Sequence, residues 1–157
     1  MPARSDDEPR VRGSRLCEIA GLNRQTRDKW VDRGLLTKTN ECDQVDLVEL
    51  IVLKLLSDNL KKGHVRIAWE EVRPKLREVV PGPNLTLVWD PQRRSAVLAF
   101  DPKEIVDLVR HGRLVQVLDI GHAIQWAREA FRREVAAYET SVAHKRRRGA
   151  TVESGNP

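Results

Sequence analysis

The chain lacks several features that would place it in a familiar class. Two cysteines in 157 residues are too few for a disulfide framework and favour a reducing compartment. No apolar run approaches the roughly 18 residues that a membrane span requires. The charged opening MPARSDDEPRVRG does not resemble a signal peptide. We therefore expect a cytoplasmic protein with no membrane partner.

Motifs of catalysis and metal binding are also missing. The sequence has no nucleophile elbow, phosphate loop, glycine-rich fingerprint, C-x-x-C pair or H-x-x-x-H pair. One enzymatic alternative stays open, because His111 and His122 lie near Asp101, Asp107 and Asp119 and such pairs can perform acid–base chemistry. We expect no enzyme, no cofactor and no bound metal, so that mutation of either histidine leaves biological output unchanged.

The composition and the positions of the helix- and strand-breaking residues indicate a small polar globular protein. Hydrophobic residues make up 40% and charged residues 32%, which allows a modest core, and the net charge of +5 gives a mild bias toward polyanions. The run PGPN at 81–84 is a strong breaker and predicts a domain boundary. The predicted parts are a flexible arm at 1–13, a first domain at 14–80, a second domain at 84–143 and a flexible basic tail at 144–157.

Helix signals dominate the first half. Ser14 is a good N-cap for a first helix, and Gly21 begins a tight corner. Asn23 predicts the cap of a second helix over 24–33, and Gly34 its end. A polar loop, TKTNECDQ, follows the second helix and shows no helical period.

Two longer helices complete this half. Asp43 or Gln44 opens a third helix, which is apolar over most of its circumference and ends at Lys61-Lys62-Gly63. A fourth helix follows over about 65–79, where Pro74 predicts a kink or break.

The pattern changes to β-structure in the second half. LTLVW and SAVLAF, joined by DPQRR, indicate a β-hairpin, DPKEIVDLVRHG a short helix, and LVQVLDI a third strand. A last helix begins at Gly121. The predicted fold class is α+β: a four-helix winged helix-turn-helix, then a small ββαβ unit, then a long C-terminal helix.

The second helix carries the clearest functional signal. A short helix behind a tight corner can enter the major groove of DNA while the first helix braces it. Trp30 is predicted to pack in the core, whereas Gln25 could read an adenine edge and Arg24 or Arg27 a guanine or a phosphate. The candidate contacts on this helix are Arg24, Gln25, Thr26, Arg27 and Lys29.

The segment IAGLNRQTRDKWVDRGLL resembles the winged helix-turn-helix of the MerR family, and the likeness covers roughly 14–78. It is carried by a corner, a threonine, an aromatic residue and a Gly-Leu-Leu exit, at Ala20-Gly21-Leu22, Thr26, Trp30 and Gly34-Leu35-Leu36. The resemblance implies a double-stranded DNA partner, recognition contacts from Arg24, Gln25, Arg27 and Lys29, and a wing contact from Lys38. Asp28 departs from the family, which often has an arginine there.

The last helix bears an apolar seam whose spacing resembles a coiled coil. It predicts either a dimer or partner contact in trans, or cover for the ββαβ sheet in cis. The seam residues are Ile124, Ala127, Phe131, Val135 and Tyr138.

These features together predict a sequence-specific DNA-binding transcriptional regulator of bacterial or phage origin, whose C-terminal half forms a homodimer or binds a partner protein. The overall layout is similar to antitoxin-like proteins of toxin–antitoxin operons. The main alternative is therefore a type II antitoxin that represses its operon and neutralises a toxin through its C-terminal half. A phage excision factor and a protein–protein adaptor are further alternatives.

Overall fold

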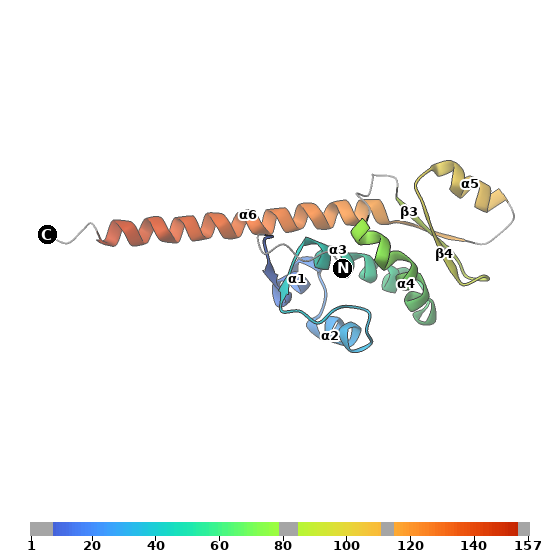
Figure 1. Ribbon diagram of the computed structural model, residues 1–157, viewed down its shortest axis with the longest axis horizontal. Helices are drawn as coiled ribbons and strands as arrows, with labels where there is room; N and C mark the ends of the chain where they lie inside the picture. Colours follow the sequence, from blue (N-terminus) through green and yellow to red (C-terminus); the bar gives the residue numbers. More distant parts are fainter. Residues whose placement is uncertain (1–7, 79–84, 111–114, 154–157) are drawn as a thin grey trace.

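The computed structural model describes residues 8–78, 85–110 and 115–153 (Figure 1). Its fold is α+β, as predicted, with a long C-terminal helix that extends well beyond the body of the molecule. In chain order the elements are β1 (Val11–Arg12), α1 (Gly13–Ala20), α2 (Arg24–Asp32), β2 (Glu41–Cys42), α3 (Gln44–Asn59), α4 (Lys62–Glu78), β3 (Thr86–Asp90), β4 (Ser95–Ala99), α5 (Pro102–Arg110), β5 (Gln116–Asp119) and α6 (Ile120–Glu153).

The helix-turn-helix forms with the predicted corner and cap. Gly21 ends α1 in the left-handed conformation, at φ +64°. The side chain of Asn23 accepts a hydrogen bond of 3.0 Å from the amide of Gln25 and so caps α2. Gly34, at φ +73°, follows the last turn of α2 and lets the chain reverse.

The start of α1 differs from the prediction because the preceding residues form a strand. β1 pairs antiparallel with β2, with Val11 opposite Cys42. The helix therefore begins at Gly13, whose amide donates to the carbonyl of Asn40, and Ser14 is not its cap. The prediction of a flexible arm through residue 13 is wrong for this strand, which is too short to show an alternating pattern.

Helices α3 and α4 follow closely on one another. Asp43 caps α3 as predicted, and its side chain and that of Asp46 form a reciprocal capping box. α3 ends at Asn59, two residues before the predicted Lys61-Lys62-Gly63 run, and α4 already begins at Lys62, so Gly63 lies in the first turn of α4. Of the kink or break predicted at Pro74, the break does not occur, because α4 continues through this residue and the buried Val72 and Leu76 hold it in the core on either side.

The second half contains a three-stranded antiparallel sheet with strand order β4-β3-β5. The predicted hairpin forms, and the side chain of Asp90 closes its turn by accepting from the amides of Gln92 and Arg93. Asp101 caps α5, as the sequence predicts, by accepting from the amide of Lys103 at 3.0 Å. The predicted glycine stop of this helix lies outside the described residues.

The last helix is longer than predicted. α6 runs to Glu153, so the tail expected from residue 144 is helical as far as this residue. Its sequence explains the difference, since Lys, Arg and Ala are good helix formers and Gly149 alone does not stop a helix. Within the described ranges, no helix is both long enough and apolar enough to span a bilayer.

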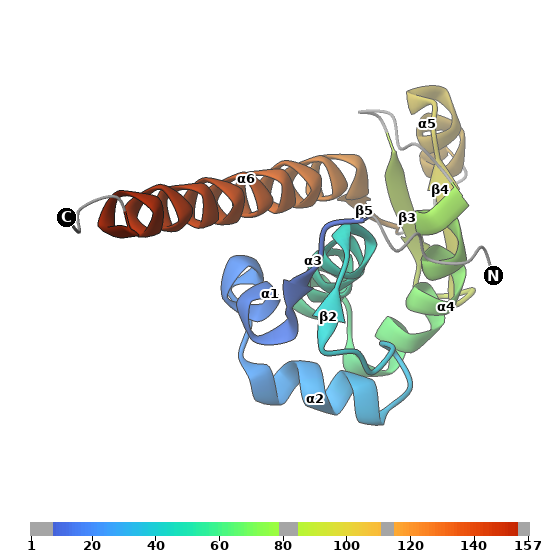
Figure 2. The same cartoon turned by 60° about the vertical axis from the view of Figure 1, so that its left-hand side comes forward.

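One hydrophobic cluster joins the two halves. It extends from Leu16 in α1 through α3 and α4 to Trp89 in β3 and Phe131 in α6. The first part of α6 lies along α3, while the sheet packs on α4, and the second view shows both contacts (Figure 2). The boundary predicted at 81–84 lies outside the described residues, but the halves on either side of it share this core.

Candidate nucleic-acid interface

Helix α2 lies at the edge of the molecule, away from the three-stranded sheet in both views (Figures 1 and 2). Trp30 anchors it, since only 8% of this side chain is exposed, which confirms its prediction as a core residue. Leu35 and Leu36 follow it into the core. The opposite side of α2 therefore faces solvent and is free of other described elements.

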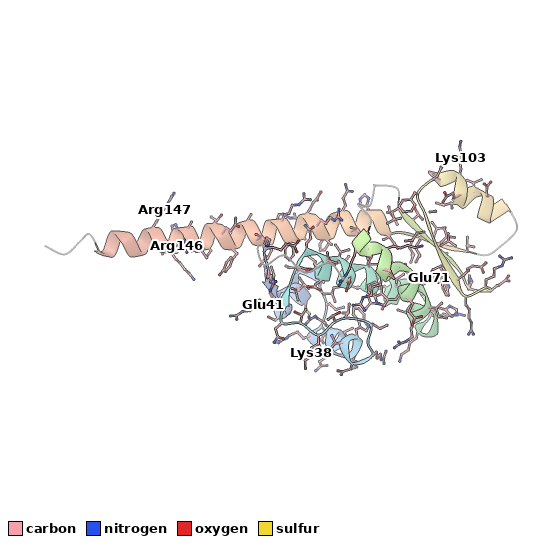
Figure 3. The ribbon with its side chains drawn as sticks, in the orientation of Figure 1. Lys38, Glu41, Glu71, Lys103, Arg146 and Arg147 are labelled. Carbon is pink, nitrogen blue, oxygen red and sulfur yellow. The ribbon has the colours of Figure 1, made fainter. Side chains whose placement is uncertain are left out.

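The structure places most of the predicted DNA contacts on this open side. Arg24, Gln25 and Lys29 are exposed on α2, and Lys38 is exposed on the loop that follows (Figure 3). Thr26 is half-buried. The four exposed side chains form a polar surface, called here the α2 surface, that a large partner could reach.

Arg27 differs from its neighbours because it turns inward. Its Nη2 atom donates to the carbonyl of Thr39 at 2.8 Å and lies 3.6 Å from Sγ of Cys42. The guanidinium also covers Gly13, where an added Cβ would stand 2.7 Å from Nη1. Arg27 thus ties α2 to β2 and to the start of α1, and this role was not predicted.

Acidic residues reduce the positive charge of the α2 surface. Asp28 and Asp32 are both exposed on α2, and Asp28 stands one turn after Arg24. Among the residues with described positions, no ion pair neutralises Asp28. Since Arg27 points inward, the exposed cations of α2 itself, Arg24 and Lys29, are balanced by these two carboxylates.

Arg12 adds a cation that sequence reasoning missed. An open hollow of about 360 Å³ lies between the start of α1, α2 and the loop before β2. Three arginines, Arg12, Arg24 and Arg27, line it together with two carboxylates, Asp28 and Glu41, so its charge is mixed with a small positive excess. Arg12 was assigned to the flexible arm, and the only signal that could have placed it here is the pairing of β1 with β2.

The seam on α6 divides into a buried and an exposed part. Ile124, Ala127 and Phe131 are at most 3% exposed because they cover the apolar helix α3 of the same chain. Their assignment to a dimer or partner surface is therefore corrected to packing in cis. Val135 is half-buried, and Tyr138, which is 71% exposed, stands where α6 leaves the body.

An ion pair holds α6 against the helix-turn-helix. Arg15 of α1 donates from Nε and Nη2 to the two carboxylate oxygens of Glu134, at 2.7 and 3.1 Å. This hydrogen bonding lowers the pKa of Glu134 below its ordinary value. The contact ties α1 to α6 in addition to the packing of α6 on α3.

The cysteines and histidines do not form a reactive cluster in the described parts of the chain. Cys17 and Cys42 are buried free thiols, and burial raises the pKa of both, that of Cys42 to about 11. No group of three potential metal ligands comes together among the residues that were placed. His122 is exposed, 3.8 Å from Asp119, and His111 lies outside the described residues.

Comparison with known protein families and with curated proteins finds no family and no relative that matches this chain. The resemblance of residues 14–78 to the MerR helix-turn-helix therefore stays a prediction. The function proposed below is therefore argued from the α2 surface, its charges and its contacts.

Proposed function

We propose that this protein is a sequence-specific DNA-binding transcriptional regulator without catalytic activity or cofactor. The observation that supports this most directly is the placement of α2. Trp30 fixes the inner side of the helix, and Arg24, Gln25 and Lys29 remain exposed on its outer side. The resemblance to the MerR helix-turn-helix points to the same helix.

The dimensions of α2 suit the major groove. A helix with its side chains is about 10–12 Å in diameter and the groove is about 12 Å wide, so α2, with nine residues and a length of roughly 13 Å, can enter it and present its first two turns to base edges. In this arrangement Gln25 reads an adenine, and Arg24 a guanine or a phosphate. Lys38 and Arg12 flank the helix and contact phosphates, which position the protein without reading sequence.

A second copy of the chain supplies useful specificity. One short recognition helix reaches few base pairs, and each good bidentate contact discriminates by only about 1–3 kcal/mol. Two half-sites bound by a dimer are the usual solution. The C-terminal end of α6 stands free of the body in Figure 1, and the side chains of residues 139–149 are exposed except for the half-buried Val142, so this end offers a surface for the second copy.

Binding to duplexes selected from a random pool tests the proposal. Arg24→Ala and Gln25→Ala should reduce the preference for the selected duplex over random DNA. Lys38→Ala should weaken binding to both about equally and lower the salt dependence by about one unit of slope. Lys103→Ala is the matched control, because Lys103 is an exposed cation on α5, far from α2 (Figure 3).

The assignment of the α2 surface to DNA contact fails if Arg24→Ala, Gln25→Ala and Lys38→Ala all bind DNA like the Lys103→Ala control. The proposal as a whole fails if no duplex is enriched over random DNA at low salt, where electrostatic attraction is strongest.

An antitoxin role is the second candidate, and the sheet gives it some support. Val97 and Val117, on opposite sides of Val88 in the sheet, are 46% and 47% exposed, and Phe100 and Val106 nearby are similarly open. Exposed apolar side chains in such a group are typical of protein-binding surfaces. A small overlapping gene whose toxic product is neutralised by co-expression of this chain would support this candidate.

A further inference from the structure

The loop after α2 is held by α4, which is distant in sequence. Three side chains of α4 reach the loop in register: Nη2 of Arg66 donates to the carbonyl of Arg33 at 2.7 Å, Nε1 of Trp69 to the carbonyl of Leu35 at 2.7 Å, and Nη2 of Arg73 to Oγ1 of Thr37 at 3.0 Å. We call these side chains the α4 donors.

Their spacing explains why they act together. Positions 66, 69 and 73 are three and four residues apart, so they share one face of α4. The acceptors at 33, 35 and 37 alternate along the loop. Two of them are carbonyls at or just beyond the end of α2, where the helix itself provides no donors. The α4 donors supply hydrogen bonds to carbonyls that have no donor within α2 itself.

The donors are themselves anchored. Trp69 is 2% exposed, and its bond to the loop is buried. The guanidinium of Arg73 lies 6.0 Å from the centre of the Trp69 ring and 3.5 Å from the carboxylate of Glu49 on α3. On the other side, His64 of α4 packs on Trp89 of the sheet, with ring centres 5.1 Å apart. α4 therefore joins the loop to both the core and the sheet.

The loop itself makes only local backbone bonds. The amides of Gly34 and Leu35 donate to the carbonyls of Val31 and Trp30, within the last turn of α2. Lys38 follows directly and is exposed. The buried side chains of Leu35 and Leu36 hold the middle of the loop in the core, and the α4 donors add hydrogen bonds at 33, 35 and 37 that direct the chain from α2 toward Lys38.

We propose that Arg66, Trp69 and Arg73 are positioning residues, which hold the loop at 33–37 and so set the place of Lys38 relative to α2. This inference rests on the proposed function for its consequence, which is the alignment of a phosphate contact with a base-reading helix. The geometric part, that α4 holds the loop, can be tested without DNA.

Amide hydrogen exchange in the full-length protein tests the geometric part. Arg66→Ala should speed exchange at Gly34 and Leu35 about fivefold, as expected for the loss of one supporting hydrogen bond, and leave α3 unchanged. Arg66→Lys should restore much of the protection. Trp69→Phe keeps an aromatic ring, loses the donor and should loosen the same amides. The control is Lys75→Ala, which removes an exposed cation from the same helix.

Binding to the selected duplex tests the consequence. Arg66→Ala should weaken binding severalfold while the slope of affinity against salt stays that of the wild type. A slope lower by about one would mean that Arg66 touches phosphate itself and would overturn a purely positioning role. Exchange equal to that of Lys75→Ala would overturn the inference altogether. If the wild type binds no duplex, the proposed function fails, while the exchange result still decides whether α4 holds the loop.

Discussion

Glu49 is a buried carboxylate whose arginine partners come from a single helix. Removal of the arginines should lower the free energy of unfolding, and further removal of Glu49 should raise it again. The residue lies on α3 and is 2% exposed. Arg73 and Arg77 of α4 approach its oxygens at 3.5 and 3.4 Å, while their own side chains are 27% and 33% exposed. The carboxylate is therefore buried, whereas about a third of each arginine side chain is exposed to water.

This asymmetry decides the sign of each perturbation. Arg73→Ala with Arg77→Ala leaves a buried charge without its partners, which typically costs 3–5 kcal/mol. Because the two contacts are long for charge-assisted bonds, we expect the low end, about 3 kcal/mol. Glu49→Leu in the same background removes the isolated charge and should recover most of that loss, since an apolar side chain of similar size suits a buried site.

Urea unfolding followed by tryptophan fluorescence measures these changes, because Trp69 and Trp89 are buried and report loss of the core. Lys75→Ala, on an exposed site of α4, should change the free energy of unfolding by less than about 0.5 kcal/mol. A double arginine variant within about 1 kcal/mol of wild type, or no recovery on adding Glu49→Leu, would refute the reasoning.

Three further predictions concern charge and thiol chemistry. Asp28→Asn should raise the affinity for any duplex severalfold in an anisotropy titration, because it removes an exposed carboxylate from the α2 surface; unchanged affinity would place Asp28 away from DNA. Glu134→Gln should lower the thermal midpoint at pH 7, and this difference from wild type should shrink as the pH is lowered below 4.5. Arg15 depresses the folded-state pKa of Glu134, so the stabilisation exists above the ordinary value of 4.5 and is lost as pH falls through the lowered one. Cys17 and Cys42 should react with iodoacetamide at pH 7 only after denaturant is added, since both are buried and burial raises both pKa values; rapid labelling of native protein would contradict this.

Local signals made the helix-turn-helix predictable. Asn23 and Gly34 each act on the backbone within a few residues, so their effects can be recognised without tertiary structure. The aromatic position at Trp30 likewise points inward because the helical period places it opposite the charged side chains. The same reasoning found the hairpin and its turn at Asp90.

Long-range contacts account for what was missed. The inward turn of Arg27 depends on the carbonyl of Thr39, which is brought into reach by β2. β2 in turn pairs with a two-residue strand that no periodicity could reveal. The α4 donors have the same origin, since a tryptophan at position 69 signals burial in the sequence but does not indicate that its N–H meets Leu35. Side-chain contacts of this kind form only when elements distant in sequence pack together.

The packing of α6 on α3 constrains how this protein can evolve. A chain cut near residue 84 would leave the side of α3 that Ile124, Ala127 and Phe131 cover in contact with water. The part that carries α2 could not be transplanted as a free-standing module, nor could the C-terminal half be exchanged without rebuilding α3. Substitutions in either half are constrained by the other, so the α2 surface and the C-terminal half must evolve together.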